Sequence, residues 1–430
     1  MQAVILAGGK GTRMLPLSVT RPKSLIPLMN KTLIEHTISS LQGSIEEFEK
    51  SYENSQTPHK SALNIEAKKD YSNHSIDEIL IVYSFFSEKI IDHLGDNYDG
   101  IKINYVEQSK LNGTGSALLC AEEYLQDRFC LIPTDDLYSE KDITECLKYE
   151  SAVLAKTVEN PERFGILKVE NCLVKEIEEK PLLPESNLAS TMFFVFNKKI
   201  VEILKKTSSD INGELDLTTA VQKYVQKEKM NCVVSKDYWQ PLAYPWDLLK
   251  GMDLLFSKTN GMRPEYYYQF CSGGVYVTPG SKIILGKNTK IKPGTVIEGN
   301  LFAGENCVIG PHAYLRGNVC LGNNCHVGRA EIKNSILFDG VKAHHTCEIL
   351  DSIIGENCNI AAQTVTANKR IDNKTVKSLY DGKLVDTGLR KFGTVMGDNS
   401  QTTCGTVINP GIKYWPNEVN KEKNVARDIK

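Results

Sequence analysis

The stretch LGKNTK IKPGTV IEGNLF AGENCV IGPHAY LRGNVC LGNNCH VGRAEI, residues 285–332, decides the fold of the second half of the chain. It divides into eight consecutive hexads, each opened by an aliphatic residue or alanine, and the fifth place is mostly small or apolar. A period of six fits neither a helix nor an ordinary strand. It is typical of a β-helix in which each hexad forms one flat side of a coil and its opening residue points inward. We therefore expect a left-handed parallel β-helix.

The hexad pattern continues beyond this stretch. After an interruption at KAHHTCEILDS (342–352), similar segments recur at residues 354–365, near 395–400 and near 407–414. The predicted organisation of the second half is a connection (251–280), a coil domain (281–415) and a charged tail (416–430).

The first half, residues 1 to about 250, alternates strand-like and helix-like segments. The strand-like segments are VILA (4–7), EILIVYS (78–84), INYVEQ (103–108), RFCLIPT (128–134) and MFFVF (192–196). This alternation predicts a Rossmann-like α/β domain with a largely parallel sheet, in which ligands bind beyond the carboxyl ends of the strands. Residues 43–75 are polar, charged and aperiodic, and we expect a mobile insertion there.

Composition excludes several classes of partner. Hydrophobic residues make up 41% and charged residues 24%, as in soluble globular proteins, and the formal net charge is -2. We therefore expect neither nucleic acid nor an anionic membrane as the main partner. Because no apolar run approaches the roughly 18 residues of a membrane helix and no signal peptide is recognisable, we expect a cytoplasmic protein. The 12 cysteines include no C-x-x-C pair. Reduced, mostly buried thiols are expected, with Cys307, Cys325 and Cys358 in the inward place of their hexads.

The loop after the first predicted strand suits a phosphate. In AVILAGGKGTRM (3–14), three glycines let the backbone approach a ligand closely, and Lys10 and Arg13 add positive charge. The G-x-x-x-x-G-K-[ST] pattern of a Walker loop is absent, and Met14 takes the place of the third glycine of a dinucleotide-binding loop. The loop therefore fits neither of these two common phosphate-binding motifs.

This loop, together with the RPK segment at 21–23, closely resembles the sugar-phosphate nucleotidylyltransferases, and further matches follow in order over roughly residues 1–250. In that family a sugar 1-phosphate oxygen attacks the α-phosphorus of a nucleoside triphosphate and pyrophosphate leaves, so that catalysis is positioning and charge neutralisation. The resemblance implies that Arg13 and Lys23 are catalytic cations and that Asp135 is the Mg²⁺ ligand. The implied nucleotide-binding residues are Leu6, Ala7, Gly8, Gly9, Lys10, Gly11, Thr12, Gln108, Gly113 and Thr114. The implied sugar-phosphate contacts of this half are Gly165, Glu179 and Lys180.

Two positions depart from the family pattern. The family usually has an aspartate, its second metal ligand, where Pro241 stands here, and Asp237 and Gln240 are the candidates to replace it. Met192 lies where the family usually has a small-residue turn near the sugar, so it is expected to narrow that pocket.

The coil half resembles the acetyltransferase half of the bifunctional UDP-N-acetylglucosamine pyrophosphorylase / glucosamine-1-phosphate N-acetyltransferases. Asn359 and Asn368 follow His345 by 14 and 23 residues, as in that family's sugar-binding pattern. The resemblance implies that His345 takes a proton from the glucosamine amine as it attacks the thioester of acetyl-CoA. It also implies that Arg316 and Lys333 hold the sugar phosphate. The departures in this half are Glu348 for a usual tyrosine and Ala361 and Gln363 for usual glycines.

The combined expectation is a bifunctional enzyme of amino-sugar nucleotide synthesis that uses acetyl-CoA, UTP and Mg²⁺. His344, next to the expected base, is the alternative base. A homotrimer or a multiple of it is expected, because three-fold packing of coils creates clefts between subunits. The alternatives are a nucleotidylyltransferase that makes another NDP-sugar and uses its coils as a trimer scaffold, and a non-catalytic sugar-nucleotide-binding relative.

Overall fold

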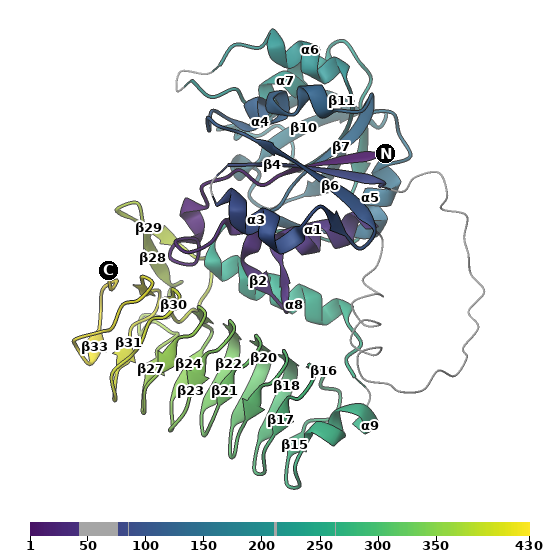
Figure 1. Cartoon of the computed structure of the whole chain (residues 1–430). Coiled ribbons are helices and arrows are strands. Elements are labelled where there is room, and N and C mark those ends of the chain that lie inside the picture. Colours follow the sequence, from purple (N-terminus) through teal and green to yellow (C-terminus); the bar gives the residue numbers. More distant parts are fainter. Residues whose placement is uncertain (43–75, 85, 210–212, 263) are drawn as a thin grey trace.

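The computed structural model describes residues 1–42, 76–84, 86–209, 213–262 and 264–430. An α/β domain is followed by a coil of parallel strands, and helix α8 (Pro245–Lys258) lies between them (Figure 1). The insertion expected at 43–75 lies outside the described residues. Within the described part of the chain, no helix combines the length and apolar character needed to span a membrane.

The α/β domain is built on a ten-stranded sheet whose centre is parallel. Its strands are, in spatial order, β10 (Gly165–Glu170), β11 (Leu173–Glu179), β13 (Asn231–Val234), β9 (Ala152–Thr157), β12 (Leu188–Asn197), β7 (Arg128–Pro133), β1 (Gln2–Leu6), β4 (Glu78–Tyr83), β6 (Ile101–Glu107) and β5 (Asn97–Tyr98). Strands β7, β1, β4 and β6 are parallel neighbours, and β12 runs antiparallel between β7 and β9. The α/β prediction is confirmed, and each of the five strand-like segments forms a strand of this sheet.

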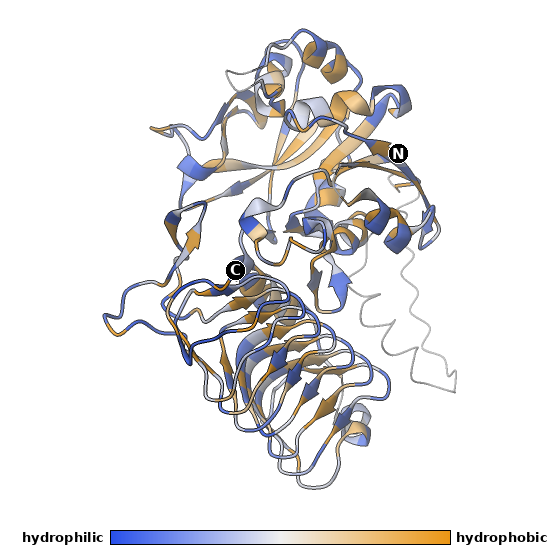
Figure 2. Cartoon of the chain, turned by 60° about the vertical axis from the view of Figure 1, so that its left-hand side comes forward, coloured by the Kyte–Doolittle hydropathy of each residue, from blue (hydrophilic) through white to orange (hydrophobic). Residues whose placement is uncertain are grey.

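Helices cover both faces of the sheet, because its strands are apolar on both sides. One face packs against α4 (Thr114–Cys120), α6 (Lys199–Lys205) and α7 (Leu217–Val225). The other packs against α1 (Leu33–Gln42), α3 (Ser87–Leu94) and α5 (Glu140–Cys146). Below the sheet, β8 (Asp136–Tyr138) pairs with β14 (Trp239–Pro241), and β2 (Pro27–Leu28) pairs with β3 (Lys31–Thr32). Figure 2 shows the hydrophobic residues gathered along the sheet strands and the coil.

The coil domain starts after α9 (Pro264–Tyr267) and has three faces of parallel strands. Face one consists of β15 (Tyr276–Val277), the first halves of β18 (Val296–Ala303), β20 (Tyr314–Leu321) and β22 (Glu331–Leu337), then β24 (Glu348–Leu350), β27 (Val365–Thr366), β31 (Val407–Ile408) and β33 (Asn424–Val425). Face two consists of β16 (Ile283–Leu285), the second halves of β18, β20 and β22, then β25 (Ile353–Ile354), β30 (Val395–Met396) and β32 (Lys413–Tyr414). Face three consists of β17 (Lys290–Ile291), β19 (Val308–Ile309), β21 (His326–Val327), β23 (Lys342–Ala343) and β26 (Asn359–Ile360).

The hexads point inward as predicted. The opening residues of all eight hexads are buried in one core: Leu285, Ile291, Ile297, Ala303, Ile309, Leu315, Leu321 and Val327. Cys307, Cys325 and Cys358 lie in the same core. The eighth hexad is an exception, because Ala330 turns inward and Glu331 turns outward, so the phase slips by one residue there.

The break in the pattern lies later than predicted. KAHHTCEILDS continues the coil, with Ala343, Cys347 and Ile349 in the core. The real interruption follows Thr366 and contains a hairpin of β28 (Lys377–Tyr380) and β29 (Lys383–Asp386). The coil then resumes at β30, which pairs with β25. The charged C-terminal residues complete the coil, since β33 pairs with β31 and Val425 is buried.

Face two of the coil packs against the α/β domain. One apolar cluster contains Trp246, Met252 and Phe256 of α8. It also contains residues between positions 14 and 33, which follow the glycine-rich loop, and outward side chains of the coil. The coil residues of this cluster include Phe302, Cys320, Ile336, Phe338, Ile353, Tyr380, Phe392 and Val395. The two domains therefore share a core, and the coil is not a tethered appendage.

Candidate active sites

The glycine-rich loop follows β1 at the carboxyl end of the central strands, where a sheet of this kind binds ligands. The Ser84 hydroxyl donates a hydrogen bond to the carbonyl of Gly8 at 2.5 Å and fixes the base of the loop. Gly9 and Lys10 are exposed. Gly11 adopts a φ of 64°, and a Cβ there would lie 3.2 Å from the side chains of Lys23 and Ser18. Glycine is therefore required where the loop closes against Lys23.

The residues expected to read the base meet the same edge of the sheet. The Gln108 side-chain amide donates to the carbonyl of Gly113 at 3.1 Å. Gly113 has a φ of 105°, and a Cβ there would lie 2.4 Å from the carbonyl oxygen of Leu215, so only glycine fits. The Thr114 hydroxyl accepts a hydrogen bond from the amide of Leu217. Residues 108–114 thus pack against residues 215–217, about a hundred positions later in the sequence.

Lys23 and Asp135 form the charged centre of this site. The Nζ atom of Lys23 lies 2.8 Å from Oδ2 of Asp135, and the Asp135 side chain is 35% exposed. Burial alone would raise the pKa of Asp135, but the Lys23 ammonium, together with the charge of Arg13 and a backbone hydrogen bond, holds this pKa below its ordinary value. The carboxylate therefore stays ionised. The structure brings together the cation and the carboxylate that the sequence motifs implied.

A second carboxylate lies beside this pair, and the sequence analysis assigned it no role. Asp136 accepts a hydrogen bond from the indole of Trp239 at 2.7 Å. Its burial and the charge of Asp135 raise its pKa to about 8. Asp136 is also the register partner of Pro241, the residue that stands where the family usually has an aspartate. The sequence Thr134-Asp135-Asp136 contains a signal for this residue, because a second acidic residue directly follows the expected metal ligand.

The donor set near Asp135 suits a Mg²⁺ ion that is also held by substrate phosphates. Mg²⁺ is commonly bound through one or two carboxylates, with phosphate oxygens and water completing the shell. Neither candidate replacement for the missing aspartate points to this centre. Asp237 pairs with Lys258 of α8, and the Gln240 amide donates to the carbonyl of Pro241.

The sugar-phosphate residues of the first half lie across one strand pair. Gly165 and Glu179 are register partners in β10 and β11, and the Thr218 hydroxyl donates to Glu179 at 3.1 Å. The Lys180 ammonium lies 2.7 Å from Glu179. Met192 sits in a bulge of β12 with a φ of 64°, a conformation that favours glycine or asparagine. The backbone therefore turns at the position where the resemblance implies a small-residue turn.

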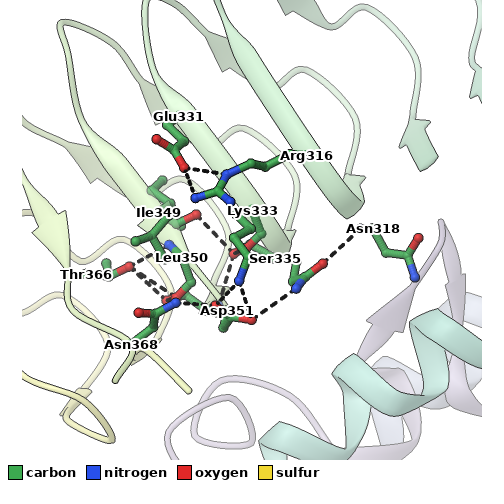
Figure 3. A network of polar contacts seen from close by, with 12 residues as sticks. Arg316, Asn318, Glu331, Lys333, Ser335, Ile349, Leu350, Asp351, Thr366 and Asn368 are labelled. Carbon is green, nitrogen blue, oxygen red and sulfur yellow. Dashed lines mark hydrogen bonds and ion pairs between the residues drawn. The ribbon is translucent and has the colours of Figure 1, made fainter. Parts of the chain in front are cut away.

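The coil carries a second polar network, at the corner between faces one and two (Figure 3). The Lys333 ammonium lies 2.9 Å from a carboxylate oxygen of Asp351. The side-chain amides of Asn334 and Asn368 also donate to Asp351. The exposed fractions of the Lys333 and Asp351 side chains are only 12% and 8%. The expected phosphate-binding lysine is therefore one member of a nearly buried cluster.

The remaining coil residues separate into two groups. Arg316 is the register partner of Lys333 on face one, and its guanidinium contacts Glu331 at 2.6 Å. His345 is exposed and follows β23 of face three, and Asn359 lies on the same face. Within one chain, no described contact joins His345 to the Lys333 network. The expected base therefore lies in the turn between faces three and one, without a described contact to the expected phosphate-binding residues.

His344 and His345 differ in their surroundings. The ring of His344 lies 4.0 Å from the ring of His326, and burial together with neighbouring positive charge lowers the pKa of both of these histidines. Both rings therefore favour the neutral form. The ring of His345 lies 5.5 Å from that of His344.

The fold and these sites define a nucleotide-transferring α/β domain joined to a parallel coil. Residues 2–50 and 55–255 match the nucleotidyl transferase family, and residues 297–428 match the family described as GMPPB C-terminal domain. The bifunctional protein GlmU of Methanocaldococcus jannaschii is 34% identical over 97% of this chain and 92% of that protein. A bifunctional protein GlmU of Methanococcus maripaludis is 33% identical over 100% of this chain and 95% of that protein.

A third relative carries both activities in its name. The bifunctional sugar-1-phosphate nucleotidylyltransferase/acetyltransferase of Sulfurisphaera tokodaii is 31% identical over 96% of this chain and 94% of that protein. The chain therefore belongs to the nucleotidyl transferase family and, over nearly its whole length, to the bifunctional GlmU group within it.

Proposed function

We propose that the chain catalyses two reactions of amino-sugar nucleotide synthesis. The coil half acetylates glucosamine 1-phosphate with acetyl-CoA, and the α/β half couples the N-acetylglucosamine 1-phosphate to UTP with release of pyrophosphate. The observation that carries this proposal is the contact between Lys23 and Asp135 beside the glycine-rich loop. The full-length similarity to bifunctional relatives supports the pairing of the two activities.

In the α/β half, the residues act by positioning and by neutralising charge. The backbone amides of residues 8–11 bind the triphosphate. Lys23 faces the reacting phosphates, and the exposed Arg13 stabilises the leaving pyrophosphate. When bound, Mg²⁺ neutralises phosphate charge. Asp135 would hold this ion, and the carboxyl group of Asp136 lies next to it.

In the coil half, His345 takes the proton from the substrate amine as it attacks the acetyl carbonyl. The sulfur of coenzyme A leaves, and the amide product forms. Arg316 and Lys333 hold the sugar phosphate, while Asn359 and Asn368 contact the sugar. This chemistry needs no metal ion.

We also propose a left-handed winding of the coil and a trimeric assembly. Asn359 lies on face three and His345 lies in the turn between faces three and one, whereas Arg316 and Lys333 lie on face one. A cleft between two packed coils would bring such groups to one substrate. A trimer, or a multiple of it, would provide three of these clefts.

The test measures both reactions on one preparation. Pyrophosphate release is measured with Mg²⁺ and N-acetylglucosamine 1-phosphate, against UTP, dTTP, ATP and GTP in turn. Thiol release from acetyl-CoA is measured with glucosamine 1-phosphate. Turnover with UTP and an acetyl transfer that His345→Ala abolishes, while pyrophosphate release continues, would support the proposal. His344→Ala is the matched control, and a loss of acetyl transfer in this variant alone would move the base to His344.

One observation favours a second function. The C-terminal match is to the family described as GMPPB C-terminal domain, a description that names no acetyltransferase, and Glu348 replaces the usual tyrosine. Turnover with a nucleotide other than UTP, without any acetyl transfer, would identify a nucleotidylyltransferase whose coil is a scaffold.

A further inference from the structure

The loop that carries both catalytic cations of the α/β domain rests on the coil domain. Between Arg13 and Lys23, the chain buries Met14 and Leu17 in the cluster shared with the coil. The Tyr380 hydroxyl of the hairpin donates a hydrogen bond to the carbonyl of residue 15 at 3.2 Å. The loop therefore takes its shape from residues far along the sequence.

Arg21 makes the strongest of these contacts. Its guanidinium forms ion pairs with Glu356 and Asp398 of the coil. The exposed fractions of the Arg21 and Asp398 side chains are 11% and 6%, and that of Glu356 is 36%. The hydroxyl of Thr20 donates to the same oxygen of Asp398 at 2.5 Å. Arg21 thus bridges two carboxylates through charge-assisted hydrogen bonds, which fix its orientation as well as contributing free energy.

The carboxylates are themselves held in place by the coil. The backbone amide of Glu356 donates to Oδ1 of Asp398 at 2.8 Å, so one oxygen of Asp398 bonds the coil and the other bonds the loop. On the other side, Pro22 separates Arg21 from Lys23 and precedes a short 3-10 helix (Lys23–Leu25). Because proline fixes φ, a displacement of Arg21 is transmitted to Lys23.

We infer that the coil domain positions the nucleotidyl transfer site through Arg21 and Asp398. Arg21 is a positioning residue, since it acts through Lys23 and touches neither Asp135 nor the glycine-rich loop in any described contact. The coil then contributes to the geometry of the α/β active site, in addition to carrying a site of its own. This inference rests on the nucleotidyl transfer activity proposed above.

If the ion pairs of Arg21 only stabilise the fold, the expected result differs from that for ion pairs that position Lys23. If the ion pairs only add stability, the folded fraction of a weakened variant keeps its turnover number. If they position Lys23, kcat falls while the protein stays folded, because a displacement of about 1 Å can cost about 100-fold in rate.

The experiment uses full-length protein and four variants: Asp398→Asn, Glu356→Gln, Tyr380→Phe and, as a control, Glu422→Gln. Asp398→Asn keeps the size of the side chain and an oxygen for the amide of Glu356. Glu422 is an exposed carboxylate that pairs with Arg427 at the same end of the coil, so its loss leaves the loop untouched. Steady-state pyrophosphate release, acetyl transfer and hydrogen exchange of peptides covering residues 12–25 are measured for each variant.

We expect Asp398→Asn to lower kcat for pyrophosphate release by about 10- to 100-fold, with KM for UTP within about three-fold of the original. Glu356→Gln and Tyr380→Phe lower kcat by about two- to ten-fold, since each removes one contact. Acetyl transfer stays within two-fold in all variants. Exchange over residues 12–25 rises about five-fold in Asp398→Asn and does not change in the control.

The inference is overturned if kcat in the folded variants stays within two-fold of the original, or if kcat falls without any change of exchange over residues 12–25. If Asp398→Asn does not fold, the other two variants decide by the same criteria, because Glu356 is partly exposed and Tyr380→Phe removes a single hydroxyl. Absence of turnover in the original protein with all four nucleotides is a separate result. It would refute the proposed function, and the exchange data would then still show whether the coil holds the loop.

Discussion

Replacing Asp351 by asparagine is expected to open the coil locally, and the cost follows from the contacts of its carboxylate. The two oxygens accept hydrogen bonds from Lys333, Asn334 and Asn368. Asparagine keeps the shape of the side chain and tolerates the φ of 47° found at this position. It has a single acceptor oxygen, however, so the lysine ammonium stays buried with no charged partner.

Breaking a buried ion pair from one side typically costs 3–5 kcal/mol, because the remaining charge is left uncompensated. We expect a loss of about 3 kcal/mol in the free energy of local opening, since asparagine can still accept one hydrogen bond from Lys333. The double variant Lys333→Met, Asp351→Asn removes the stranded charge. It is expected to cost about 1 kcal/mol, so that adding Lys333→Met to Asp351→Asn recovers about 2 kcal/mol of stability.

The assay is hydrogen exchange of the coil amides over residues 331–351, which reports the opening free energy of this part of the coil. Arg316→Met is the matched control, because its pair with Glu331 is 39% and 25% exposed and should contribute less than about 1 kcal/mol. A change below about 1 kcal/mol for Asp351→Asn, or an equal change for Arg316→Met, would refute the reasoning that burial makes the Lys333–Asp351 pair costly to break.

Three further predictions concern single side chains. Lys23→Met is expected to lower kcat for pyrophosphate release by about 100-fold or more while acetyl transfer stays within two-fold, because it removes a cation from the reacting phosphates; steady-state kinetics of both reactions test it. Met192→Gly should be more stable than Met192→Ala by about 1 kcal/mol in thermal or urea unfolding, the reverse of the usual order, because the residue has a φ of 64° and both variants lose the same packing. Lys413 is buried against Tyr380 and has a pKa of about 8, below its unfolded value of 10.5. Between these two pH values the unfolded chain binds the Lys413 proton more tightly than the folded chain does. The free energy of unfolding, measured relative to Lys413→Met, should therefore rise by about 2 kcal/mol from pH 8 to pH 10. A free-energy difference between the two proteins that stays flat or falls over this range would contradict the buried ammonium.

The interior of the coil could be predicted from the sequence because each hexad repeats the same local requirement. An inward residue must fill a core of nearly constant width, so the period of six survives even when outward residues vary. The one-residue slip at Ala330 could not be predicted in this way, since alanine fits both an inward and an outward place. The same slip hid the inward residues Ala343, Cys347 and Ile349, and the polar segment that contains them was wrongly read as an interruption.

The α/β site was predicted where short motifs carry the geometry. Gly11, Gly113 and Lys23 are set by a close backbone approach or a single ion pair, and each motif lies at a strand end that the alternation of elements already placed. The position of Asp136 was not predicted, because it depends on the pairing of β8 with β14. That pairing joins residues about a hundred positions apart and sets Asp136 opposite Pro241.

The partners of Arg21 were the contacts that the sequence predicted least well. Glu356 and Asp398 follow it by 335 and 377 residues, and both lie outside the opening place of their hexad-like segments (354–359 and 395–400), where the pattern sets no requirement. They meet Arg21 because face two packs against the α/β domain, and that packing is set by the apolar outward residues of the face, which a hexad pattern does not distinguish from solvent-facing ones. The RPK segment therefore meets two requirements. Lys23 makes a contact within the α/β site, and Arg21 makes a long-range contact with the coil. In the proposed mechanism Lys23 faces the reacting phosphates, while Arg21, two residues earlier, fixes the position of that lysine. A change in the coil would then reach the nucleotide site without altering any residue of the glycine-rich loop.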